Sequence, residues 1–170
     1  AYSFVISDFL KNILKFNAEK LYISSFLCIF CKRITNLSTK DMILQFKVKN
    51  FLSIREEQTL DFTASADKTY EDYAVVKIKG VRISKLGVVY GPNASGKSNI
   101  LKALAWFIFY LVASRSKKPG TGTGLTPFMM DENSRNQNSS FELIFYIGDV
   151  RYEYSVVLNN QKIYKEELYF

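Results

Sequence analysis

At residues 91–98 the chain reads Gly91-Pro92-Asn93-Ala94-Ser95-Gly96-Lys97-Ser98. This is the pattern Gly-x-x-x-x-Gly-Lys-Ser, in which a glycine-rich loop surrounds phosphate groups with its backbone N–H groups. The apolar run at 87–90 just before it predicts a short buried strand, and the residues after it predict a helix from about Lys97 to Ser114. Strand, loop and helix in this order are the context that the motif requires. The sequence therefore predicts an α/β fold built around a phosphate-binding loop (P-loop).

The residue types of this loop explain how it would hold a nucleotide. The two glycines allow backbone conformations that a side chain disfavours, and the start of the helix adds the positive end of its dipole. The ammonium of Lys97 is expected to reach the β- and γ-phosphates and to take the catalytic role, while the hydroxyl of Ser98 is expected to bind Mg²⁺. Asn99 is expected beside the α-phosphate. The expected nucleotide-binding residues are Gly91, Asn93, Ala94, Ser95, Gly96, Lys97, Ser98 and Asn99.

Around this unit the sequence from Met42 onward predicts mainly β-strands. Apolar and polar residues alternate between Leu44 and Val48, which is typical of a half-buried strand. Residues 117–140 are rich in Gly, Ser, Asn and Pro, which predicts a long mobile loop. Strands are expected at 43–50, 58–62, 73–79, 141–147, 151–158 and 163–170, with a hairpin turn at 148–149 and a further turn at 159–160. The tyrosines expected on exposed or half-buried sheet faces are Tyr146, Tyr152, Tyr154 and Tyr164.

The sequence pattern of the first 41 residues differs from that of the rest of the chain. Residues 1–33 predict one or two helices, and the polar stretch at 34–41 predicts a linker. Two interpretations stay open. Residues 1–41 are either an extension or upstream segment outside the functional domain of residues 42–170, or a helical element that packs on that domain.

Composition limits the class of protein. Hydrophobic residues make up 48% and aromatic residues 15% of the chain, which is typical of a folded domain. The net charge of +7 keeps a DNA or RNA partner open, although a mildly basic surface explains it equally well. Cys28 and Cys31, without any histidine, supply too few ligands for a structural zinc site and suggest reduced thiols in a cytoplasmic protein. The apolar runs at 21–31 and 100–113 are too short to span a membrane, so we expect no membrane partner.

Several motifs together resemble a known family. The P-loop with its following Asn99 is similar to that of ABC-type ATPases of the SMC, RecF and overcoming-lysogenization-defect groups, which typically show Gly-Pro-Asn-x-Ser-Gly-Lys-Ser-Asn. The stretch Lys49-Asn50-Phe51-Leu52-Ser53-Ile54, followed by Leu60-Asp61-Phe62, resembles their first strand pair. Pro127-Phe128-Met129-Met130-Asp131-Glu132-Asn133-Ser134, followed by Phe141-Glu142, resembles a segment of the bacterial AAA-family ATPases related to abortive infection. The resemblance covers about residues 42–170.

This resemblance implies an ABC-type head, of which the chain carries the N-terminal half with an antiparallel β-subdomain. It implies ATP and Mg²⁺ as ligands, a backbone donor from Asn93 to the γ-phosphate, a homodimer formed through the ATPase head, and a role in phage defence or on nucleic acid, with an effector protein as a further partner. Two positions depart from the related SMC proteins, which often have a basic residue at the position of Leu52 and have glycine at that of Ala94. The departure at Leu52 puts a contact with the nucleotide base in doubt.

The catalytic elements that the family places in its C-terminal half do not occur here. Neither an apolar strand ending in Asp-Glu nor a Ser-Gly-Gly signature is found in the 170 residues. We therefore expect the chain to be roughly the first third of a longer ATPase, and to hydrolyse ATP slowly or not at all by itself. Two other classes stay open: another P-loop NTPase such as a GTPase or kinase, although no Asn-Lys-x-Asp follows the loop, and a non-catalytic nucleotide- or nucleic-acid-binding module.

Overall fold

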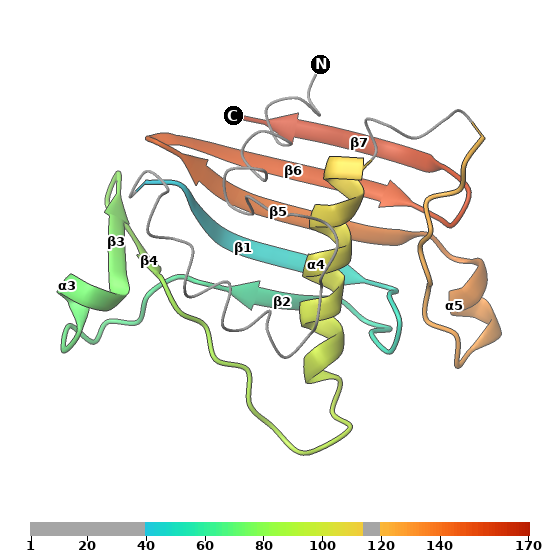
Figure 1. The fold of residues 1–170 in the computed structure, drawn as a ribbon, viewed down its shortest axis with the longest axis horizontal. Helices are drawn as coiled ribbons and strands as arrows, with labels where there is room; N and C mark the ends of the chain where they lie inside the picture. Colours follow the sequence, from blue (N-terminus) through green and yellow to red (C-terminus); the bar gives the residue numbers. More distant parts are fainter. Residues whose placement is uncertain (1–39, 114–119) are drawn as a thin grey trace.

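The computed structural model describes residues 40–113 and 120–170, which form a mixed α/β domain. A five-stranded antiparallel sheet in the order β2-β1-β5-β6-β7 is crossed on one face by helix α4, and a separate two-stranded sheet, β3-β4, lies at one end (Figure 1). The elements are β1 (Met42–Lys49), β2 (Gln58–Asp61), α3 (Glu71–Ala74), β3 (Val75–Ile78), β4 (Val81–Ser84), α4 (Lys97–Ala113), α5 (Glu132–Asn136), β5 (Ser139–Ile147), β6 (Val150–Leu158) and β7 (Ile163–Tyr169). The helices expected within residues 1–33, with Cys28 and Cys31, lie outside the described residues.

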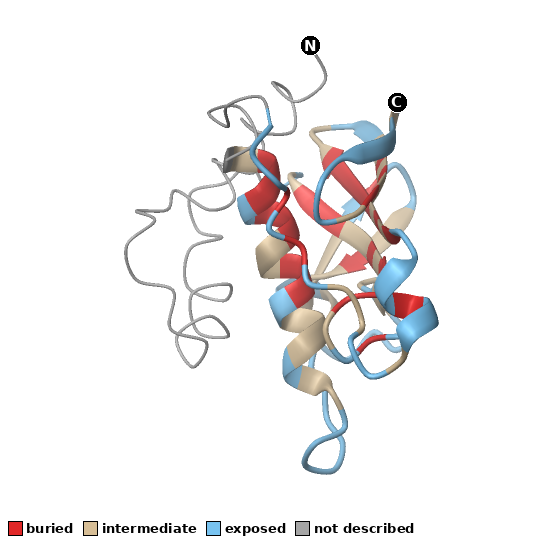
Figure 2. Ribbon diagram, turned by 90° about the vertical axis from the view of Figure 1, so that its right-hand side faces the viewer, coloured by how far each residue is buried: buried red, intermediate tan, exposed pale blue. Residues whose placement is uncertain are grey.

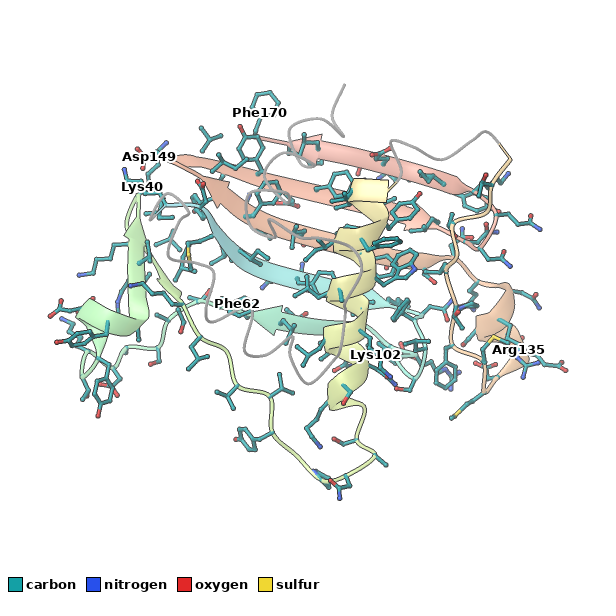
Figure 3. All side chains as sticks on the ribbon, in the orientation of Figure 1. Lys40, Phe62, Lys102, Arg135, Asp149 and Phe170 are labelled. Carbon is teal, nitrogen blue, oxygen red and sulfur yellow. The ribbon has the colours of Figure 1, made fainter. Side chains whose placement is uncertain are left out.

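The predicted hairpins at the C-terminal side are confirmed. Ile147 pairs with Val150, so β5 and β6 are joined by the two-residue turn Gly148-Asp149, in which Gly148 has a φ of 58°. The carboxylate of Asp149 forms a 2.8 Å ion pair with Lys40, just before β1, and Figure 3 shows the two side chains beside each other. A short connection then leads from β6 into β7, which pairs antiparallel with it.

The main core lies between α4 and the sheet. Apolar side chains recur along α4 with helical spacing, so one side of the helix is buried against the strands while Phe109 and Lys102 face solvent (Figure 2). The ring of Phe107 stacks on that of Phe141, with centroids 5.1 Å apart and an interplanar angle of 7°. Burying each such side chain stabilises the fold by roughly 1.5–3 kcal/mol. This packing fixes the helix, and with it the loop from which the helix emerges.

A second, smaller core lies between one end of the five-stranded sheet and the β3-β4 hairpin. Ile78 and Ile83 of the β3-β4 hairpin pack with Met42 and Tyr146. Tyr146 is buried in this second core and Tyr154 in the main core, so the expectation of exposed or half-buried positions is wrong for both. Tyr154 is turned toward α4, and its hydroxyl donates a 2.8 Å hydrogen bond to Glu166, which satisfies the polar end of the buried side chain. Tyr152 is half-buried and Tyr164 exposed, as predicted.

The strand expected at 73–79 begins later than predicted. Tyr73 and Ala74 belong to the short helix α3, in which the N–H of Ala74 donates to the carbonyl of Tyr70, and the strand covers only β3. Two acidic residues in the first turn favour the helix, because they face the positive end of its dipole. One of them, Glu71, also accepts from Arg82 of β4 at 3.1 Å.

The buried strand expected at 87–90 is not present. These residues have no regular secondary structure, and Val88 and Tyr90 are 71% and 91% exposed. A strand needs a hydrogen-bonded neighbour, and no strand of residues 40–113 and 120–170 pairs with this segment. The apolar side chains of Val88, Val89 and Tyr90 are therefore exposed in the described domain.

Within the described ranges, no helix combines the length and the apolar character that crossing a membrane demands.

Candidate nucleotide-binding site

The P-loop is an exposed turn that leads directly into α4. At the bottom of the view in Figure 1, the chain descends from β4, turns, and enters the helix at Lys97. Ala94 and Gly96 have φ values of 62° and 85°. The alternation of left-handed with ordinary backbone conformations makes successive N–H groups converge, and such concavities bind anions. The loop therefore has a backbone geometry suited to phosphate.

The loop also carries free hydrogen-bond donors. The N–H of Asn99 donates to the carbonyl of Gly96 at 2.8 Å, which closes the first turn of α4. The preceding amides lie at a helix start, where no carbonyl of the helix can accept from them. No acidic side chain occupies the first turn of α4. In the described part of the chain, no acceptor is found for the backbone N–H groups of Ala94, Gly96, Lys97 and Ser98.

The side chain of Lys97 folds back over the loop. Its Nζ donates to the carbonyl oxygens of Gly91 at 2.7 Å and Pro92 at 2.5 Å, and lies 3.4 Å from Oγ of Ser95. No carboxylate of residues 40–113 and 120–170 forms an ion pair with this ammonium. Neutral carbonyls therefore hold this positive charge at the loop, and a phosphate bound there would compensate it.

The turn between β1 and β2 forms a second wall beside the loop. Phe51 and Ile54 exchange two backbone hydrogen bonds of 2.8 Å, so Leu52 and Ser53 make a tight two-residue turn. Oγ of Ser53 accepts a 2.6 Å hydrogen bond from Nδ2 of Asn99. A Cβ atom placed on Gly96 would stand 3.4 Å from the same oxygen, so the turn lies directly against the start of α4.

The place expected for Asn99 beside the α-phosphate stays a prediction. The side chain of Asn99 contacts the β1–β2 turn, and no local sequence pattern indicates that contact. Ser53, which lies beside the start of α4, is not among the expected site residues. The signal was present in the stretch Lys49–Ile54, which resembles the same family, but nothing in the pattern placed its serine beside the P-loop.

A buried asparagine fixes this turn to a distant loop. Asn50 is 2% exposed, and its Nδ2 donates to the carbonyls of Ser134 at 2.9 Å and Gln137 at 3.0 Å. Its Oδ1 accepts from the N–H of Phe128 at 3.0 Å. The N–H of Leu52 donates to the carbonyl of Thr126 at 3.1 Å, which adds a second tie between the same two segments. The two motifs that resemble the family, around Asn50 and around Phe128, are thus one hydrogen-bonded unit.

The expected long loop is consequently more ordered than its composition suggested. Asp131 caps the short helix α5. The hydroxyl of Ser134 donates a hydrogen bond to the carboxylate of Asp131, which lowers the pKa of the Asp131 carboxyl group. Farther back, the hydroxyl of Thr123 donates to the carbonyl of Asn159 at 2.6 Å, and Leu125 is buried. The prediction of one loop over 117–140 is therefore wrong for 132–136 and for the start of β5, while residues 117–119 lie outside the described residues.

The metal expectation rests on Ser98, whose side chain is exposed at the start of α4. Within the described residues no group of three or more His, Cys, Asp or Glu side chains could hold a metal ion. A magnesium ion bound with a nucleotide takes few protein ligands, because phosphate oxygens and waters fill most of its coordination sphere. One serine hydroxyl beside a donor-rich loop therefore fits Mg²⁺ bound together with a nucleotide.

The fold is a mixed α/β domain in which a Gly-x-x-x-x-Gly-Lys-Ser loop leads into α4. Residues 86–169 match the model of the family described as "AAA domain, putative AbiEii toxin, Type IV TA system". The matched region runs from just before the P-loop to β7, and over these residues the chain is similar to that AAA domain family. In the two other comparisons, no curated protein and no solved structure matched the chain.

Proposed function

We propose that this domain binds ATP together with Mg²⁺ and forms part of an ATPase. The observation that carries the proposal is the ammonium of Lys97, held over the P-loop next to backbone amides, where the described residues supply neither a carboxylate partner for the ammonium nor acceptors for the amides. A polyanion such as a triphosphate supplies the acceptors and the negative charge that this arrangement lacks. The match to the AAA domain family agrees with this chemistry.

Each residue of the loop would then have a defined part. The amides from Ala94 to Ser98 would hold phosphate oxygens, and Lys97 would leave the carbonyls of Gly91 and Pro92 to pair with the β- and γ-phosphates. Ser98 would bind the metal ion. Mg²⁺ would neutralise phosphate charge during transfer, and hydrolysis would further require a group that positions water.

Finer assignments belong to the same proposal and rest on the resemblance of the motifs around Asn50, the P-loop and Phe128. We propose an ABC-type head that dimerises with a second copy, acts in the cytoplasm, and serves phage defence, with an effector protein as a partner. The mixed α/β fold with its antiparallel sheet is compatible with an AAA-type P-loop domain, and the ABC-type head is the finer proposal.

The charge distribution gives no support to a nucleic-acid-binding role for the described domain. Its residues include 15 Lys and Arg against 14 Asp and Glu, a net charge of +1 out of the +7 of the whole chain. The basic excess thus belongs to residues 1–39 and 114–119. Strong non-specific binding to DNA or RNA depends on a basic face, so we favour the nucleotide as the ligand of this domain.

Competition between nucleotides tests the proposal. ATP should displace a fluorescent ATP analogue from the 170-residue chain more effectively than GTP, and Ser98→Ala should reduce the gain in affinity that Mg²⁺ gives while leaving metal-free binding nearly unchanged. A preference for GTP would point to another class of P-loop NTPase. The absence of any nucleotide binding would contradict the proposal.

A further inference from the structure

The β1–β2 turn holds an unusual backbone conformation at the site. Leu52 has a φ of 51°, in the left-handed region that a branched side chain rarely adopts. The first position of a two-residue hairpin turn with such a φ is normally glycine. Backbone strain of this kind persists only where the surroundings enforce it, and it concentrates at functional sites. Here the enforcing contacts are the bond from Leu52 to Thr126 and the network of the buried Asn50.

The consequence of this conformation is the position of Ser53. The turn places its Oγ 2.6 Å from Nδ2 of Asn99 and 3.4 Å from the point where a Cβ on Gly96 would stand, at the end of α4 where the free amides lie. Because Oγ accepts the hydrogen bond from Asn99, its own O–H remains a donor. No acceptor for this proton is found among the residues that the structure describes. A neutral donor therefore lies at the rim of the P-loop, supplied by a segment about 40 residues before it.

We propose that Ser53 is a further nucleotide-binding residue, whose hydroxyl donates to a phosphate oxygen on the side of the P-loop nearest Asn99. Asn50 is the positioning residue: its buried amide holds the turn that carries Ser53. This inference rests on the proposed binding of ATP. It assigns part of the site to the β1–β2 turn, whose Leu52 takes the place of the basic residue that related SMC proteins often have.

The contact with Ser53 should contribute equally to the affinity for ATP and for ADP. Asn99 follows the P-loop on the helix, whereas Nζ of Lys97 lies at the carbonyls of Gly91 and Pro92 at the start of the loop, so we assign to Ser53 a phosphate that both nucleotides possess. A single hydrogen bond from an exposed hydroxyl contributes about three- to tenfold in affinity. Since Ser53 is exposed, its replacement should leave the thermal stability of the protein unchanged.

The test measures Kd for ATP and ADP, and Tm, on the 170-residue chain and its variants. Ser53→Ala should weaken both nucleotides about three- to tenfold at unchanged Tm, and Ser53→Thr, which keeps the hydroxyl, should restore binding. Ser65→Ala is the matched control, since it removes an equally exposed hydroxyl from the segment after β2. It should bind as wild type.

Lys97→Ala separates the two claims. If Lys97→Ala weakens binding but Ser53→Ala does not, this inference is wrong and the nucleotide site stands. Binding by Ser53→Thr that is as weak as that of Ser53→Ala would show that the hydroxyl is not the determinant. A loss for ATP alone would overturn the assignment to the shared phosphates, and unaffected binding by Lys97→Ala would overturn the site as a whole.

Discussion

The side-chain amide of Asn50 donates a 2.9 Å hydrogen bond to the backbone carbonyl of Ser134, 84 residues farther along the chain. With its bonds to Gln137 and Phe128, this side chain joins the end of β1 to the segment around α5. Asn50 and Ser134 are both buried, and neither the end of β1 nor the segment around α5 is part of the P-loop. The shape of the candidate site therefore depends on a contact outside the motif that identifies it.

Removing this amide should destabilise the fold. Asn50→Ala leaves two carbonyls and one N–H without their partner, and it places alanine at a φ of 56°. Since each buried group left unsatisfied costs about 1–3 kcal/mol, we expect a loss of about 3 kcal/mol in the free energy of unfolding. Urea titration, followed by the fluorescence of the single tryptophan, Trp106, measures it. Asn138→Ala, at an exposed position, should change the value by less than about 0.5 kcal/mol, and equal stability of the two variants would contradict the role of Asn50.

Gly96 should be needed for binding more than for folding. Gly96→Ala forces alanine to a φ of 85° and brings its Cβ within 3.4 Å of Oγ of Ser53. Gly80 has nearly the same φ, 83°, with open space around it, so Gly80→Ala carries the same backbone strain far from the P-loop. Both variants should lose roughly 1–2 kcal/mol of stability. Only Gly96→Ala should lose affinity for ATP; a similar loss in Gly80→Ala would mean that strain alone explains the effect.

The sequence predicted those elements whose determinants are local. The P-loop leads into α4 within one residue of the expected start, and the turn Gly148-Asp149 defines the hairpin of β5 and β6. The failed predictions depend on distant neighbours. The segment at 87–90 has strand-like residues but no strand beside it, and Tyr154 is buried because α4 covers its face of the sheet.

The same distinction applies to the site. The motif itself brings Gly91 to Asn99 together, because these residues are adjacent in sequence. Ser53 and Asn50 reach the site through the pairing of β1 and β5 and through the loop before α5, and no local pattern encodes that juxtaposition. The roles of Lys97 and Ser98 toward a nucleotide stay predictions that the loop geometry supports.

The stacking of α4 on the sheet should dominate the stability of the domain. Phe107 is fully buried against Phe141, whereas Phe109, two residues along the same helix, is 54% exposed. Phe107→Ala should cost about 3–5 kcal/mol, enough to unfold a marginally stable domain, because it removes a large buried ring and leaves a cavity. Phe109→Ala should cost less than about 0.5 kcal/mol. Chemical denaturation of both variants measures these losses of stability. Comparable losses for Phe107→Ala and Phe109→Ala would contradict the packing of Phe107 between α4 and the sheet.

The central claim is that the loop at 91–98 is a phosphate site, and Lys97 tests it most directly. Lys97→Ala removes an ammonium whose hydrogen-bond partners among the described residues all belong to the loop itself, so the fold should survive. Charge-assisted hydrogen bonds contribute roughly 1.5–3 kcal/mol, and each 1.4 kcal/mol corresponds to about tenfold in affinity. Lys102→Ala is the matched control, since it removes the same charge from the exposed side of the same helix (Figure 3). Titration with a fluorescent ATP analogue in the presence of Mg²⁺ should show about ten- to a hundredfold weaker binding by Lys97→Ala and wild-type binding by Lys102→Ala. Equal affinity of wild type and Lys97→Ala would contradict the account.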